Sequence, residues 1–120
     1  NADAYYNRGV AKSDLGDKQG AISDYNQAIA INPKDAGAYN NRGVVKAVLG
    51  DKQGAIADFN QAIAINPKSA IAYDNRGVAK SELGDKQGAC SDYKKASSLG
   101  RKLAIKYLQG QNGAWCRNMP

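Results

Sequence analysis

The chain has 120 residues, of which 42% are hydrophobic and 23% charged, a balance that excludes an intrinsically disordered chain. No apolar run approaches the ~20 residues that a membrane-spanning helix needs. No basic segment followed by an apolar stretch marks a signal peptide, so we expect a cytoplasmic protein with no membrane span. The net charge of +6 sits at one end: ten basic and ten acidic residues balance over 1–85, whereas 86–120 holds seven basic residues and one acid.

An internal repeat of 34 residues dominates the chain. The units 2–35, 36–69 and 70–103 align without a gap over most of their length, and the first two are identical at 26 of 34 positions. The strings NRGV and DKQGA recur in all three units. One unit of this size cannot bury its own apolar faces, so we expect neighbouring units to stack into a continuous core.

Each unit predicts two helices joined by a tight turn. In the first unit Asn1 is a good N-cap for a helix over about 2–15, and Gly16 ends that helix because glycine accepts the left-handed conformation. Asp17 can cap the second helix, which stops before Pro33 because the residue before a proline is pushed out of the helical region. The same signals recur 34 residues later, and in the third unit Arg101 replaces the proline.

Small and aromatic residues alternate along the two helices of each unit. Gly9 on the first helix is matched by Ala21 and Ala28 on the second, and these small residues allow the helices to approach closely. The aromatic residues are expected to fill the space between units: Tyr5, Tyr25, Tyr39, Phe59, Tyr73 and Tyr93.

This pattern resembles the tetratricopeptide repeat: an aromatic, two residues, an apolar residue and glycine, then alanine, three residues and an aromatic, then proline. In the first unit those positions are Tyr5, Gly9, Ala21, Tyr25, Ala28 and Pro33. The resemblance covers about 100 of the 120 residues and implies an all-α solenoid of three helix-turn-helix units with a C-terminal capping helix. The array would span 1–109, with repeats 2–35, 36–69 and 70–100 and a capping helix over 101–109. The tail 110–120 would pack back, with Trp115 as its anchor, or be disordered.

All three units depart from the family at two positions. Arginine replaces the usual leucine at Arg8, Arg42 and Arg76, and lysine replaces the usual tyrosine at Lys12, Lys46 and Lys80. These side chains could form a basic ladder for a ligand, or they could pair with Asp24, Asp58 and Asp92. We favour pairing, because the resemblance turns this face of the first helix toward the packed side.

The resemblance also places a concave, ligand-binding groove on the first helix of each unit. The predicted groove residues are Tyr6, Asn7, Val10, Asp14, Asn40, Asn41, Val44, Val48, Ile71, Asp74, Asn75, Val78 and Glu82. Asn7, Asn41 and Asn75 form a row that resembles the asparagine ladder in the repeat domain of O-linked N-acetylglucosamine transferase. An amide both donates and accepts, so such a row suits a peptide backbone. Duplication alone would also produce a regular row of solvated asparagines.

Some members of the family bind acidic chaperone tails with a carboxylate clamp of two lysines, two asparagines and an arginine. Of those places only Asn41 matches here, so we expect no carboxylate-clamp ligand. The groove carries Asp14, Asp74 and Glu82, which indicates a neutral or basic extended segment of a protein or peptide. The N-terminal end has no cap of its own, so self-association through that end is the alternative function.

Other chemistry has little support in the sequence. The chain has no histidine and no phosphate-binding glycine loop, so we expect no catalytic residue, no cofactor and no enzyme activity. Two cysteines and scattered carboxylates indicate no metal site. The basic C-terminal cluster lacks interleaved aromatics, so we expect no nucleic-acid binding. Cys90 replaces Ile22 and Ile56, which favours a buried, unpaired thiol over a disulfide with Cys116.

Overall fold

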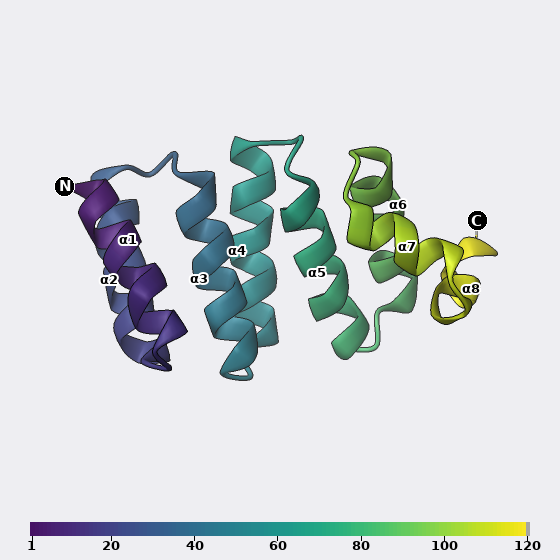
Figure 1. The fold of residues 1–120 in the computed structure, drawn as a ribbon, viewed down its shortest axis with the longest axis horizontal. Coiled ribbons are helices and arrows are strands. Elements are labelled where there is room, and N and C mark those ends of the chain that lie inside the picture. The colour runs from purple at the N-terminus through teal and green to yellow at the C-terminus, as the bar shows by residue number, and fades with distance from the viewer. Residues whose placement is uncertain (120) are drawn as a thin grey trace.

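The protein is a row of helical hairpins stacked side by side (Figure 1), seen in a computed structural model that describes residues 1–119. The elements are α1 (Ala2–Asp14), α2 (Lys18–Ile31), α3 (Ala36–Val48), α4 (Lys52–Ile65), α5 (Ala70–Glu82), α6 (Lys86–Ser98), α7 (Lys102–Gln109), the 3₁₀ turn η1 (Gln111–Gly113) and α8 (Ala114–Arg117). The stack measures 46 × 25 × 21 Å, and the two termini lie at its opposite ends. The all-α solenoid with a C-terminal helix is confirmed.

The local signals in the sequence act where they were expected. Asn1 Oδ1 accepts hydrogen bonds from the backbone N–H groups of Asp3 and Ala4, and Asp17 accepts one from Gly20 at 2.9 Å. Gly16 has a φ of +90°, so it requires the left-handed conformation that ends α1. The first helix of each unit ends one residue earlier than predicted, because Leu15 and its equivalents already leave helical geometry.

The glycine of each NRGV string packs against an aromatic ring of the second helix. A Cβ atom on Gly43 would lie 2.7 Å from Cε1 of Phe59, and one on Gly9 would lie 2.8 Å from Cε1 of Tyr25. We expected alanines to be the close partners of these glycines. The ring of the second helix takes that place instead, and both Phe59 and Tyr25 are almost fully buried.

The repeated arginines and lysines close over buried carboxylates. In the second unit Arg42 donates to both oxygens of Asp58, from Nε at 2.9 Å and Nη2 at 2.7 Å, while Lys46 Nζ lies 3.2 Å away. The first and third units repeat this arrangement around Asp24 and Asp92. Pairing is therefore confirmed, and the basic ligand ladder is wrong, since these cations are already held by carboxylates.

Hydrogen bonding shifts the pKa values of Asp24 and Arg42. The hydrogen bond from Arg8 holds the pKa of Asp24 below its usual value, although burial of the carboxylate acts in the opposite direction. The hydrogen bond with Asp58 likewise raises the pKa of Arg42. Arg42 also donates from Nη1 to Asn26 in the preceding repeat at 2.8 Å, so the pair joins adjacent repeats.

The C-terminal end of the stack is covered by α7 and by a tail that folds back onto α6. A disulfide joins Cys116 in α8 to Cys90 in α6, and both cysteines are buried. The favoured expectation of an unpaired Cys90 is therefore wrong, because α8 brings Cys116 against the third repeat. Trp115 is half-buried and donates to the Tyr107 hydroxyl at 3.0 Å, so Cys116 anchors the tail more deeply than Trp115 does. Pro120 lies outside the described residues.

Candidate functional site

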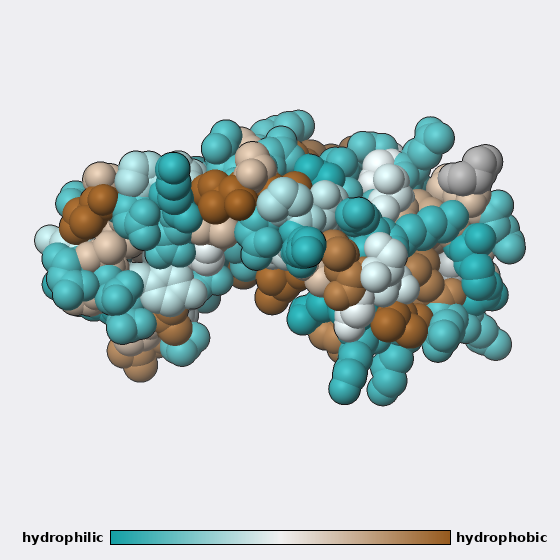
Figure 2. Space-filling model, turned by 90° about the horizontal axis from the view of Figure 1, so that it is seen from above, coloured by the Kyte–Doolittle hydropathy of each residue, from teal (hydrophilic) through white to brown (hydrophobic). Residues whose placement is uncertain are grey.

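The first helices α1, α3 and α5 lie side by side and line one face of the stack (Figure 1). Seen from above, the molecule is hollowed along one side between its two ends, and hydrophobic side chains gather in separate patches between hydrophilic ones (Figure 2). Two adjacent pockets open on the face of the first helices and share Val44 and Asn75. They form one continuous groove.

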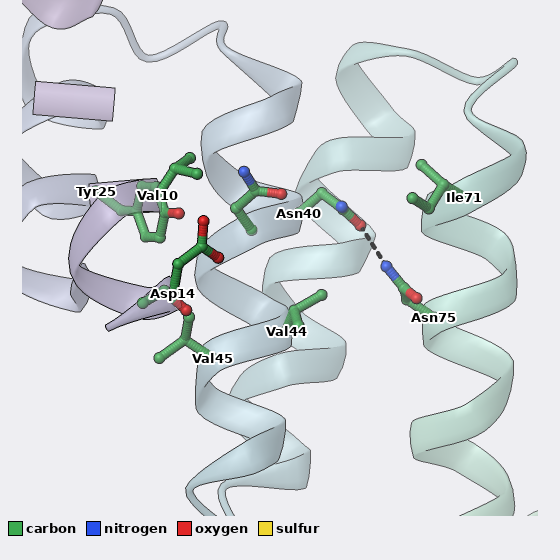
Figure 3. Close-up of a pocket in the computed structure, with 10 residues that line it drawn as sticks. Val10, Asp14, Tyr25, Asn40, Val44, Val45, Ile71 and Asn75 are labelled. Atoms are coloured by element: carbon green, nitrogen blue, oxygen red, sulfur yellow. Dashed lines mark hydrogen bonds between the residues drawn. The ribbon is translucent and has the colours of Figure 1, made fainter. Parts of the chain in front are cut away.

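Pocket 1 has a volume of about 350 Å³ and spans all three repeats. Figure 3 shows Val10 and Asp14 from α1 facing Asn40 and Val44 from α3 across it. Its lining is Val10, Ser13, Asp14, Tyr25, Asn40, Asn41, Val44, Val45, Ile71 and Asn75. Its size is at the lower end of the range of small-molecule pockets, which suits one side chain of an extended ligand.

Pocket 2 is smaller, about 210 Å³, and lies between the second and third repeats. Its lining is Val44, Ala47, Val48, Lys52, Phe59, Asn75, Val78, Ala79 and Glu82. Val48 and Val78 expose 64% and 44% of their surface, so this pocket offers apolar area to a partner.

The structure brings most of the predicted groove residues together in these two pockets, with three exceptions. Tyr6, Asn7 and Asp74 line neither pocket. The sequence prediction also missed Tyr25 and Phe59 on the second helices, which form the floor of the groove. Their signal was present in the repeat pattern, but an aromatic at that position is as easily interpreted as core alone.

The row of asparagines is less uniform than the sequence suggests. Asn7 is exposed, and among the described residues no repeat lies before it to contact it. Asn41 Nδ2 donates to the Tyr6 hydroxyl at 2.9 Å, and Asn75 Nδ2 donates to Asn40 Oδ1 at 3.1 Å (Figure 3). Asn40 is itself buried, since only 7% of its surface is exposed. These amides therefore join adjacent repeats, and the ladder stays a prediction.

The groove carries less free negative charge than its composition suggests. Asp74 accepts from Arg101 Nε at 3.3 Å, and Glu82 pairs with Lys52 at 2.5 Å. Asp14 is exposed and takes part in no ion pair within residues 1–119. Among the predicted groove acids, Asp14 in pocket 1 is thus the one that takes part in no ion pair within residues 1–119.

Comparison with known proteins agrees with this geometry. A family model described as "Tetratricopeptide repeat" matches residues 2–35 and 36–69, and a second one with the same description matches 70–102. This chain belongs to the tetratricopeptide repeat family. Proteins of this family are generally non-catalytic interaction domains. No curated protein matches the chain in a sequence search.

Several solved structures are similar to this chain along most of its length. The crystal structure of MamA is 35% identical with a TM-score of 0.80; the match covers 87% of this chain and 61% of that one. The first TPR of Spaghetti (RPAP3), bound to the HSP90 peptide SRMEEVD, is 25% identical with a TM-score of 0.85, over 90% of this chain and 87% of that one. The OM64 TPR domain of Arabidopsis is 28% identical with a TM-score of 0.83, over 90% and 93%. This chain thus spans less than two thirds of the MamA structure.

Within residues 1–119 no helix is long and apolar enough to cross a membrane. The same residues contain no group of three or more histidine, cysteine or acidic side chains placed to hold a metal ion.

Proposed function

We propose that this tetratricopeptide array is a non-catalytic scaffold that binds an extended peptide segment of another protein in the groove of α1, α3 and α5. The observation that carries the proposal is the pair of adjoining pockets, which together draw on all three repeats and share Val44. Exposed apolar side chains at Val48, Ile71 and Val78 border them. A continuous, partly apolar groove of this kind suits an extended chain with several anchoring side chains.

The charge of the groove favours a neutral or basic ligand. Within residues 1–119 Asp14 takes part in no ion pair, Lys52 and Arg101 are held by Glu82 and Asp74, and Lys18 donates to the carbonyl and hydroxyl of Ser13. The Spaghetti domains were solved with an acidic HSP90 peptide, which makes an acidic tail the competing ligand. That competitor would meet an unpaired carboxylate here, so we propose no carboxylate-clamp ligand.

A random peptide library displayed on phage tests the proposal, with the affinities of selected peptides measured by fluorescence anisotropy. We expect Val44→Arg to weaken binding by at least about tenfold, because it fills the shared wall of both pockets. Ala64→Arg on α4 adds the same charge at an exposed residue outside both pockets and should leave binding unchanged. Equal effects of the two variants would move the binding site off the groove.

The peptide SRMEEVD provides the test of ligand charge. We expect it to bind this chain more weakly than neutral or basic peptides selected from the library. Tight binding of that peptide, lost in Asn41→Ala, would show an acidic ligand and overturn the proposed charge preference.

Self-association through the N-terminal end is a second candidate function. Ala4 is exposed, whereas Ala38 and Ala72 at the same repeat position are fully buried by the preceding repeat, and Leu15 exposes 87% of its surface. The contact of α7 with α6 at the other end favours head-to-head over head-to-tail stacking. Sedimentation equilibrium from low to high micromolar concentration tests self-association: a monomer throughout excludes it, and an Ala4→Arg-sensitive dimer supports it.

A cytoplasmic location remains a prediction. The buried Cys90–Cys116 disulfide bears against it, because the reducing cytosol of most cells keeps such pairs open. The location of an epitope-tagged chain, with the redox state of its cysteines measured by thiol alkylation, would decide between the reducing cytosol and an oxidising compartment.

A further inference from the structure

The two pockets of the groove are the same site in successive repeats. Val10, Ser13, Asp14 and Tyr25 of pocket 1 lie 34 residues before Val44, Ala47, Val48 and Phe59 of pocket 2. Each pocket is then closed by the first helix of the following repeat. Because the backbone framework is repeated, any difference in chemistry between the pockets comes from the side chains that differ.

Four matched positions differ between the pockets. Val45 becomes Ala79 and stays apolar, whereas the other three exchanges go from polar to apolar. Ser13 becomes Ala47, Asp14 becomes Val48, and Tyr25 becomes Phe59. These are three of the eight differences between the first two repeats, and they fall in one place. Pocket 1 therefore carries a carboxylate and two hydroxyl groups where pocket 2 carries a methyl, an isopropyl and a phenyl group.

Pocket 1 can hold a cation. The Asp14 carboxylate is exposed and unpaired among the described residues. Tyr25 is 2% exposed, and burial raises the pKa of its hydroxyl, so the floor stays neutral and adds no second negative charge. The amide oxygen of Asn41 lines the same pocket and can accept a hydrogen bond from an ammonium or guanidinium group. The hydroxyl of Ser13 already accepts one from Lys18 Nζ at 3.0 Å.

Pocket 2 is neutral and apolar. Val44, Val48 and Val78 each expose between 38% and 64% of their surface there, above the buried ring of Phe59. The two charged residues of its lining, Lys52 and Glu82, form an ion pair with each other. A charged ligand side chain would gain little in this pocket, whereas an aliphatic one would remove apolar surface from water.

We propose that the groove selects a peptide with a lysine or arginine in pocket 1 and an aliphatic side chain in pocket 2, about three residues apart. The inference rests on the proposed function and specifies its ligand. The spacing follows because packed helices lie roughly 8–10 Å apart and an extended chain advances about 3.3 Å per residue. The two pockets admit this spacing with the peptide running in either direction.

A blocked nine-residue peptide with a central lysine, a leucine three positions to each side and small residues elsewhere tests this pattern in either orientation. Fluorescence anisotropy with the full chain should show about fivefold weaker binding when norleucine replaces the lysine, since a partly exposed charge pair contributes that much. Replacing both leucines with glycine should weaken binding by at least about tenfold.

Two variants of the chain locate the cation. In Asp14→Asn the preference for lysine over norleucine should disappear. Asp3→Asn removes the same charge from the same helix, outside both pockets, and should retain the preference. Asp14→Val combined with Val48→Asp exchanges the chemistry of the pockets and should make a peptide with two lysines around a central leucine as good a ligand as the original.

The outcomes separate this inference from the proposed function. Equal affinity for the lysine and norleucine peptides, or equal effects of Asp14→Asn and Asp3→Asn, overturns the inference. If library peptides without this pattern still bind and lose affinity in Val44→Arg, the groove function stands and the pattern is wrong. If no peptide binds in a Val44-dependent manner, both the proposed groove function and this inference are wrong.

Discussion

The two ends of the stack contain closely related residues in opposite surroundings. Among residues 1–119 no helix lies on the outer side of α1 at the N-terminal end, and Arg8 leaves 59% of its side chain exposed, against 18% for both Arg42 and Arg76. At the other end α7 and the disulfide-bonded tail cover α6. In a repeat protein the contribution of a residue is therefore set as much by the neighbouring repeat as by its own.

Removing the Cys90–Cys116 disulfide should lower the unfolding free energy the most, because it releases the tail that covers the C-terminal end of the stack. We expect the Cys90→Ala/Cys116→Ala variant to lose about 3 kcal/mol of unfolding free energy, since the bond closes a loop of 26 residues in the unfolded chain. Urea unfolding measures the loss. Wild-type protein refolded in reductant should lose a similar amount, whereas the variant should not respond; an unchanged wild-type midpoint contradicts the prediction.

A matched set of alanines tests the comparison without any change of chemistry. Ala38 and Ala72 are fully buried under the preceding repeat, so replacing either with leucine should overpack the interface and cost about 2 kcal/mol. Ala4→Leu at the same position of the first repeat should change the unfolding free energy by less than about 0.5 kcal/mol. Thermal and urea unfolding of the three variants measures this. A cost for Ala4→Leu that matches the other two would mean that something covers the N-terminal end.

The arginines Arg8, Arg42 and Arg76 test the same difference between a covered and an uncovered repeat. Arg42→Ala should cost about 2 kcal/mol, because it leaves Asp58 buried with Lys46 alone and also breaks the hydrogen bond to Asn26. Arg76→Ala should behave alike through Asp92 and Asn60. Arg8→Ala should cost less, since Arg8 is more exposed and, within residues 1–119, donates only to Asp24. Equal losses at all three positions, measured by urea unfolding, would show that the preceding repeat is irrelevant.

Acid should have the smallest effect, and its sign follows from the pKa of Asp24. That pKa is lowered from 3.8 in the folded protein, so the ionised carboxylate stabilises the fold above about pH 4. The contribution is lost as the pH falls through the lower folded value. The difference in unfolding free energy between wild type and Asp24→Asn should thus be constant between about pH 5 and 7 and shrink below pH 4. A difference independent of pH down to 2.5 would mean that Asp24 is not held as a carboxylate by Arg8.

Much of the fold could be predicted from the sequence. The N-caps at Asn1 and Asp17 and the left-handed Gly16 are local signals, so they act within a few residues and repeat faithfully. The pairing of Arg42 with Asp58 also follows from spacing, because both residues belong to one hairpin. The groove was harder to predict from the sequence. Its first-helix residues could be placed on one face, but Tyr25 and Phe59 on its floor come from the second helices.

By itself the sequence determined the paired helices of the three repeats, their N-caps, their order and the family, because these depend on contacts within one 34-residue unit. Only the tertiary structure decided that Ala4 is exposed while Ala38 is buried, that Asn75 bonds to Asn40, and that Cys90 is bonded to Cys116. Each of these depends on which element lies next to the repeat. A repeated sequence carries no local signal for that difference, because the same residues meet a neighbour in one unit and solvent in another.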